Sequence, residues 1–342
     1  MQVTDGLLPE IVGAVAIAAL LAYAVLAGAD FGGGVWDLLA RGPRAAEQRA
    51  RVAEAMGPVW EANHVWLIFL IVLLFSCFPA AYSTLSVAFF APFHLILIGI
   101  VLRGAAFVFR SYGYATGGAG VTWGHIFGGA SVITPFLLGA CLGAVSNGHI
   151  RVENGQLQPG SALAWLDPLA LATGALSLAL CAYLAAVFLT LETTGELRED
   201  FRWRALGVWV VAGVLSIGTL LLTYQEAPRL WEALTSARAA PAVLAGVILA
   251  PASAWAMLRR WYRTARVLSA GQVVLLLIGW ALAQWPFIIY PDITLHAAAS
   301  PPATLRFVLW TLIPGLGLLL PSLWLLFAVF KGRNPAASDA AS

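Results

Sequence analysis

Three ionisable residues stand at the edges of long apolar segments, where a charge is costly. Asp30 follows the first apolar segment, and Glu61 and His64 precede the second. A charged side chain near the centre of a membrane helix costs on the order of 2.5–3.5 kcal/mol on insertion scales, so such residues usually face a protein interior. Carboxylates and imidazoles exchange protons readily in such places. The three residues therefore predict a proton-accepting cluster at one membrane boundary.

The spacing of these residues is compatible with a shared site but leaves a second interpretation open. Glu61 and His64 are three positions apart and share one face of a helix. Asp30 lies on the preceding segment, and consecutive spans form an antiparallel pair, so it can approach Glu61. Alternatively, Asp30 caps backbone amides in a Gly-rich turn, and Glu61 satisfies the start of the second span or pairs with an arginine. The glycines at 32–34 would then allow a tight exit from the first span.

Further residues are expected to support this cluster or to lie at an interface near it. They are Trp60, Asn63, Arg103 and Arg110. Arg103 and Arg110 frame the segment RGAAFVFR, seven positions apart, and so lie on nearly one face of a helix. They either extend to the lipid–water boundary or pair with Asp30 or Glu61.

Metal or haem binding is an alternative role for the histidines of the apolar segments. Glu61-x-x-His64 matches half of a di-iron site, in which this motif recurs on two helices. The sequence contains no second Glu-x-x-His. His94 and His125 lie in apolar segments and could bind haem, but intramembrane histidines more often hydrogen-bond between helices. The spacing therefore argues against a di-iron site, and haem binding by His94 or His125 is the less favoured interpretation.

The elements that must position these residues are membrane helices. The chain is 61% hydrophobic and 11% charged, with a mean hydropathy of +0.85, outside the range of soluble globular domains. About 20 apolar residues span a bilayer as a helix, and alternating strand patterns are absent. The sequence predicts an all-α polytopic membrane protein with nine transmembrane helices, at 11–29, 65–82, 85–102, 121–147, 168–191, 205–224, 239–258, 267–290 and 307–330.

The placement of positive charge predicts the orientation of these spans. Fifteen of the 19 basic residues fall in connections that would share one side with the C-terminus. The positive-inside rule therefore places the N-terminus outside and the C-terminus inside, in agreement with an odd number of spans. Asp30 and Glu61 would then lie on the cytoplasmic side.

No soluble domain is expected. Residues 1–332 should form a single integral membrane domain, and the small, polar residues 333–342 a disordered C-terminal tail. Between the first two spans, RGPRAAEQRARVAEAMG predicts a short surface helix that ends at Gly57-Pro58.

Several motifs also resemble those of a known family. They occur in the same order along the whole chain and are GADFGGG, GPVWEANHVWLI, FPAAYSTLS, LRGAAFVFR, TGELR and SPPATLRFVLWTLIPGLGLLLPSLW. In these motifs the chain is similar to subunit II of the cytochrome bd-type quinol oxidases, and the first three together are specific. The resemblance implies two four-helix bundles plus one peripheral helix, in the bacterial inner membrane.

The resemblance also implies a function at the level of a complex. This chain would be the haem-free subunit II, in a heterodimer with a subunit I that holds haem b, haem d and the quinol site. The complex, with possible small accessory membrane subunits, would oxidise quinol and reduce dioxygen to water, taking protons from the cytoplasm. Subunit II would support assembly and line a proton-uptake route, to which Asp30 and Glu61 correspond by position. Lipid and quinol would be the other partners, and nucleic acid would not be one.

The chain departs from the family pattern at three positions. Some relatives have Asp where Glu61 stands, many have an acidic residue at Val108, and many have Gln where Leu137 stands. A proton route that uses the last two positions does not carry over.

An alternative from another class is a stand-alone secondary transporter. That class is marked by inverted repeats and by helices broken near the bilayer midplane. Here the Gly/Pro interruptions lie mostly at span ends, and the ionisable groups lie at the inner boundary. This pattern favours the oxidase subunit.

Overall fold

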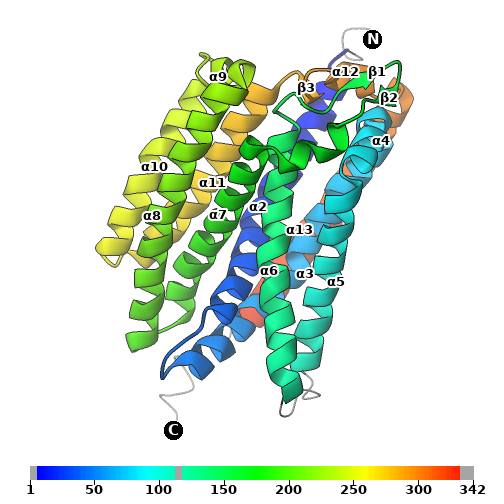
Figure 1. Cartoon of the computed structure of the whole chain (residues 1–342). Helices are drawn as coiled ribbons and strands as arrows, with labels where there is room; N and C mark the ends of the chain where they lie inside the picture. The colour runs from blue at the N-terminus through cyan, green and yellow to red at the C-terminus, as the bar shows by residue number, and fades with distance from the viewer. Residues whose placement is uncertain (1–5, 112–117, 332–342) are drawn as a thin grey trace.

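The structure is a computed structural model that describes residues 6–111 and 118–331, without the side chains of 56–62, 110–111, 118–121 and 326–331. The expected tail at 333–342 lies outside the described residues. Long helices run roughly parallel to one another (Figure 1). The helices are α2 (Leu8–Leu38), α3 (Ala45–Cys77), α4 (Pro79–Ala88), α5 (Phe90–Ser111), α6 (Gly118–Ala144), α7 (Pro168–Glu192), α8 (Gly195–Glu226), α9 (Pro228–Leu234), α10 (Ala240–Leu258), α11 (Tyr262–Gln284), α12 (Leu295–Ala298) and α13 (Pro302–Lys331), with a 3-10 helix, η1, at Ser161–Leu166.

Eight of these helices are long and apolar enough to cross a membrane, counted over the described residues. A ninth candidate combines the end of α3 with α4, and it is bent by 117°. α3 ends at Cys77 and Pro79 opens α4, where a residue without an N–H group is tolerated because the first helical amides have no partner. The predicted span at 65–82 is therefore wrong at its end.

Two predicted helix boundaries near the candidate cluster are also wrong. α2 does not stop after the first apolar run but continues through the glycines to Leu38. α3 is helical without interruption from Ala45 to Cys77, so no break separates a surface helix from the second span at Gly57-Pro58. Proline is tolerated inside membrane helices because neighbouring groups satisfy the backbone groups that it frees.

Short irregular elements cover the end of the molecule at which α2 begins (Figure 1). They include two antiparallel hairpins, β1 (Val152–Glu153) with β2 (Gln156–Leu157), and β3 (Phe287–Ile289) with β4 (Ile293–Thr294). The predicted span at 267–290 is too long, because α11 ends at Gln284 and the chain turns into β3. The opposite end carries the α2–α3, α7–α8 and α10–α11 connections, which are rich in arginine.

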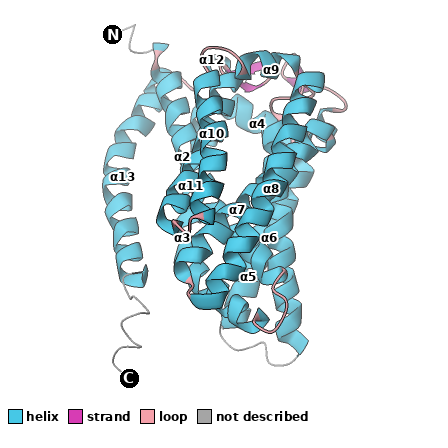
Figure 2. Ribbon diagram, turned by 90° about the vertical axis from the view of Figure 1, so that its left-hand side faces the viewer, coloured by secondary structure: helices cyan, strands magenta, loops and turns pink. Residues whose placement is uncertain are grey.

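α7 lies at the centre of the helix packing. It contacts α2, α6, α8 and α11, and its run Tyr183–Val187 is almost completely buried. Small residues in this run allow close approach between membrane helices. α13 differs, since none of the residues in its most apolar described window is buried, and Figure 2 shows it to one side of the other helices.

Candidate functional site

Asp30 lies inside α2, two turns before its end, and its side chain is fully buried. The Arg103 guanidinium of α5 binds this carboxylate with two hydrogen bonds, Nη1 to Oδ2 at 2.5 Å and Nη2 to Oδ1 at 2.6 Å. Asn63 Nδ2 of α3 donates a third, to Oδ2, at 2.7 Å. The expectation that Asp30 caps a Gly-rich turn is therefore wrong, because no turn is present there and the carboxylate is held by two other helices.

Arg103 is itself almost completely buried, and each of its guanidinium nitrogens has an acceptor. Nη2 also donates to the backbone oxygen of Asp30 at 2.9 Å, and Nε donates to Ser131 Oγ at 2.8 Å. The rings of Phe31 and Phe127 lie 5.0 and 4.8 Å from the guanidinium carbon, within cation–π distance. Of the two expectations for Arg103, the structure shows pairing with Asp30 rather than extension to the lipid–water boundary.

The ion pair joins four helices and has a clear electrostatic consequence. Asp30 comes from α2, Asn63 from α3, Arg103 from α5 and Ser131 from α6. A buried ion pair is neutral as a unit, but loss of one partner leaves an uncompensated charge and is strongly destabilising. The geometry therefore describes a buried ion pair that ties the four helices together.

The glycines after Asp30 allow α2 to approach its neighbours rather than to leave the membrane. A Cβ at Gly32 would overlap the carbonyl oxygen of Cys181 on α7 and lie 2.7 Å from the Cβ of Ala185. A Cβ at Gly34 would overlap the Ser131 side chain, which binds Arg103. The expected tight exit at 32–34 is wrong, and the physical reason for glycine here is interhelical contact.

Gly32→Ala is therefore expected to destabilise the protein by about 1–3 kcal/mol, the usual cost of overpacking a well-packed interior. Thermal unfolding of the purified protein measures this effect. Gly213→Ala on α8 is the matched control, because a Cβ there meets nothing within 4 Å. Replacing a helical glycine in open space should raise stability slightly. Equal unfolding temperatures for the two variants would contradict the close-contact explanation.

The other predicted residues are on α3 and α5, the helices that supply Asn63 and Arg103. Asn63 is buried, and its Oδ1 atom has no hydrogen-bond partner among the described residues, so it can accept one. His64 follows on α3 and is half-buried. Glu61 and Trp60 lie on α3 and Arg110 on α5, but their side chains lie outside the described part of the structure.

Ser131 and Phe127 contact Arg103, and the sequence did not single them out. Ser131 Oγ accepts from Arg103 Nε and donates to the Phe127 backbone oxygen at 2.7 Å. A serine within an apolar segment commonly bonds its own helix in this way, so the sequence carries no specific signal for a second partner. Val108 is exposed, and Leu137 is buried in the apolar core.

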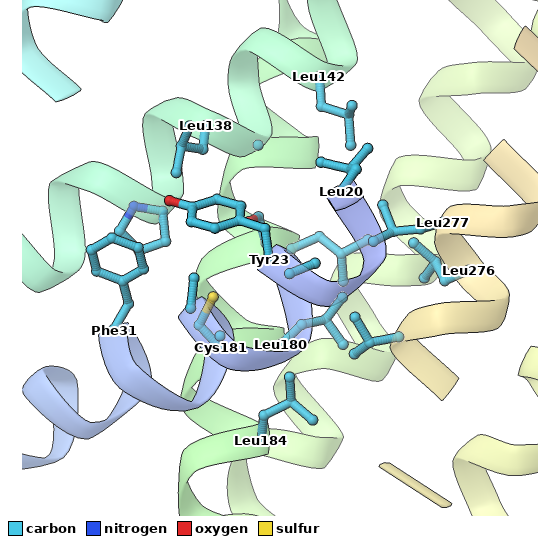
Figure 3. Close-up of a pocket in the computed structure, with 18 of the residues that line it drawn as sticks. Leu20, Tyr23, Phe31, Leu138, Leu142, Leu180, Cys181, Leu184, Leu276 and Leu277 are labelled. Atoms are coloured by element: carbon cyan, nitrogen blue, oxygen red, sulfur yellow. The ribbon is translucent and has the colours of Figure 1, made fainter. Parts of the chain in front are cut away.

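An apolar cavity of about 170 Å³ lies next to this cluster, between α2, α6, α7 and α11. Phe31, whose ring contacts Arg103, lines it on one side, and Leu276 and Leu277 line the opposite side, with Tyr23 between them (Figure 3). Hydrocarbon dominates this lining. The cavity therefore has space for an apolar group but offers few partners for proton transfer.

No group of three or more His, Cys, Asp and Glu side chains that could hold a metal ion occurs among the described residues. His94 is a candidate haem ligand by its sequence position. It lies on α5, with its Nδ1 atom 2.7 Å from the backbone oxygen of Phe90. His125 is exposed on α6.

Known proteins are similar to this chain in sequence. Residues 8–330 match the family described as cytochrome bd terminal oxidase subunit II. The putative cytochrome bd menaquinol oxidase subunit II of Bacillus subtilis (strain 168) is 25% identical over 319 residues, covering 90% of this chain and 91% of that protein. The cytochrome bd-I ubiquinol oxidase subunit 2 of Escherichia coli (strain K12) is 27% identical over 212 residues, covering 57% of this chain and 55% of that protein.

A solved structure shares the fold. A chain in the structure of bd oxidase from Geobacillus thermodenitrificans superposes with a TM-score of 0.77 at 21% identity, covering 96% of this chain and 99% of that one. The eight apolar helices and the family match identify a multi-pass protein of the bacterial inner membrane. Because the family match extends over nearly the whole sequence, the chain belongs to the cytochrome bd terminal oxidase subunit II family.

Proposed function

We propose that this chain is the haem-free subunit II of a complex that oxidises quinol and reduces dioxygen to water. The observation that carries the proposal is the family match over residues 8–330. Haem b and haem d belong to subunit I in this proposal, and that subunit also holds the quinol site. This chain supports the assembly of subunit I and contributes to proton uptake.

The proposed membrane arrangement has nine spans, with α3 and α4 together forming the bent one. α2, α3, α5 and α6 form one four-helix bundle, α7, α8, α10 and α11 form the second, and α13 is peripheral. The packing of α2 with α3, of α5 with α6, of α7 with α8 and of α10 with α11 supports this grouping, and α7 packs against α2 and α6 where the two bundles meet. The arginine-rich connections at one end support an N-terminus outside and a C-terminus inside.

In the proposed proton route, Glu61 accepts a proton from the cytoplasm and passes it toward subunit I. Asp30 and Arg103 form a fixed ion pair beside this route, and Asn63 links α3 to that pair through its amide nitrogen. Asn63 Oδ1, which has no hydrogen-bond partner among the described residues, and the ring of His64 both lie within one helical turn of Glu61 along α3 and supply polar groups there. Support for this proposal comes from the burial of the ion pair and from the position of Glu61 on the same helix as Asn63.

The experiment that tests the proposed function is purification of the tagged chain from its native membrane, followed by a subunit gel and an optical spectrum. We expect a second membrane subunit to co-purify in a 1:1 ratio and to bring b-type and d-type haem absorbance. A chain that purifies without any haem-bearing partner would contradict the proposal and would favour a protein that acts alone.

A further inference from the structure

A polar pocket of about 230 Å³ lies at the arginine-rich end of the molecule, away from the Asp30 ion pair. It is formed by the connection between α2 and α3, the first turn of α3 and the first turns of α8, which all lie at the lower end of Figure 1. The side chains that decide its chemistry are those of Arg41, Arg44, Gln48, Asp200, Trp203 and Arg204.

Arg44 binds the acidic residue of this pocket, Asp200, and also the exposed Glu196 beside it. Its Nε and Nη2 donate to the Asp200 carboxylate at 2.9 and 2.7 Å, and its Nη1 contacts Glu196 at 2.5 Å. Gln48 Nε2 adds a third hydrogen bond to Asp200 at 3.1 Å. One guanidinium therefore faces two carboxylates, and with Arg41 and Arg204 the group has three positive and two negative charges, a net charge of +1.

Arg204 has a buried hydrogen-bond donor without an acceptor. Its Nη2 donates to Gln48 Oε1 at 2.7 Å, but Nη1 is buried and has no partner among the described residues. The rings of Trp36 and Phe201, each 5.3 Å from the guanidinium carbon, hold the group in place. An unpaired buried N–H of a charged group is costly, so a turn of the guanidinium that brings Nη1 to an anionic oxygen in the pocket would be favoured. Arg41, exposed on the same pocket, adds a second positive charge.

An apolar stripe on α8 begins at the mouth of this pocket. Trp203, Val210, Val214 and Ile217 are 62%, 55%, 65% and 63% exposed. Their spacing of three, four and seven positions places them on one helix face. Tryptophan is typical of the membrane–water interface, and exposed aliphatic residues further along the same helix face are typical of a surface in contact with acyl chains. The cationic pocket and the apolar stripe are thus continuous along one helix.

We propose that this pocket binds the headgroup of an anionic phospholipid. The phosphodiester oxygens accept hydrogen bonds from Arg41 and from Arg204, whose guanidinium turns so that Nη1 reaches the headgroup, and the acyl chains lie along the α8 stripe. Basic pockets between membrane helices recognise anionic headgroups in this way. The site is separate from the proposed proton route and does not depend on it.

The test is lipid retention by the purified complex, measured by native mass spectrometry during titration with phosphatidylglycerol or phosphatidylcholine. We expect the wild-type complex to bind phosphatidylglycerol in preference to the zwitterionic lipid, and Arg41→Gln and Arg204→Gln each to weaken that binding about tenfold. Arg41→Gln keeps the test valid if Arg204→Gln fails to fold, because Arg204 also packs against aromatic rings. Arg51→Gln is the matched control, since Arg51 is an exposed arginine of α3 that pairs with Glu54 outside the pocket. It should bind lipid as the wild type does.

Three results would overturn the proposal. They are unchanged phosphatidylglycerol binding by both pocket variants, an equal loss of binding in Arg51→Gln, and displacement of the lipid by millimolar inorganic phosphate. The last result would assign the pocket to a small free anion instead.

Discussion

Arg103→Leu is expected to destabilise the protein by about 3–5 kcal/mol, the typical cost of removing one partner from a buried ion pair. The reason is that the Asp30 carboxyl group would stay fully buried while losing its counter-charge and both guanidinium hydrogen bonds. The yield of assembled complex and its thermal unfolding temperature both measure this effect. We expect both to fall sharply.

Two further variants separate the ion pair from arginine in general. Arg51→Leu removes an exposed arginine whose pair with Glu54 should contribute no more than about 1 kcal/mol. The double variant Asp30→Asn/Arg103→Leu removes both charges, so it should be more stable than Arg103→Leu alone. If the effects of the two substitutions simply add, the coupling described here is wrong.

Glu61→Gln is expected to slow quinol-dependent oxygen consumption on the order of 10²-fold, within the range typical of proton-transfer groups. Glutamine has nearly the same size as glutamate but cannot accept and release the proton, so assembly and the haem spectrum should be unchanged. Turnover of the purified complex, normalised to its haem content, measures the effect.

The matched control for Glu61→Gln is Glu54→Gln, two turns earlier on the same helix. Glu54 is exposed and pairs with Arg51, so its substitution should leave turnover unchanged. An unchanged rate in Glu61→Gln would reduce Glu61 to a structural role at the start of the second span. A fall in haem content would likewise assign Glu61 to assembly rather than to proton transfer.

The sequence predicted most of the membrane helices, because long apolar runs have few alternatives in a bilayer. It failed where the end of a helix depends on tertiary contact. The glycines after Asp30 have the composition of a turn, but they are needed for close approach to Cys181 and Ser131, and α2 continues through them. The error at Pro79 is the opposite one, since the predicted span continues past the residue at which α3 ends. Hydropathy alone does not reveal that the chain turns by 117° there.

The sequence singled out Asp30, Asn63 and Arg103, which the structure brings together, but it gave neither their geometry nor the contact with Ser131. Asp30 stood out because a charged side chain next to an apolar segment is energetically costly. Arg103 was one of two arginines, seven positions apart on one helix face, that could pair with it. The sequence predicted that Asp30 lies at the end of the first span. In the structure Asp30 lies inside α2, because this helix continues to Leu38. Asn63 was expected near the site, but its hydrogen bond to Asp30 depends on the register of α3 against α2.

The central claim is that this chain is an essential subunit of a quinol-oxidising, oxygen-reducing complex. The most direct measurement is quinol-dependent oxygen uptake by membranes in which only this chain has been deleted, compared with the same membranes after it is restored. The account predicts loss of uptake together with an altered haem spectrum, and recovery of both on restoration. Full uptake and a normal haem spectrum without the chain would contradict it.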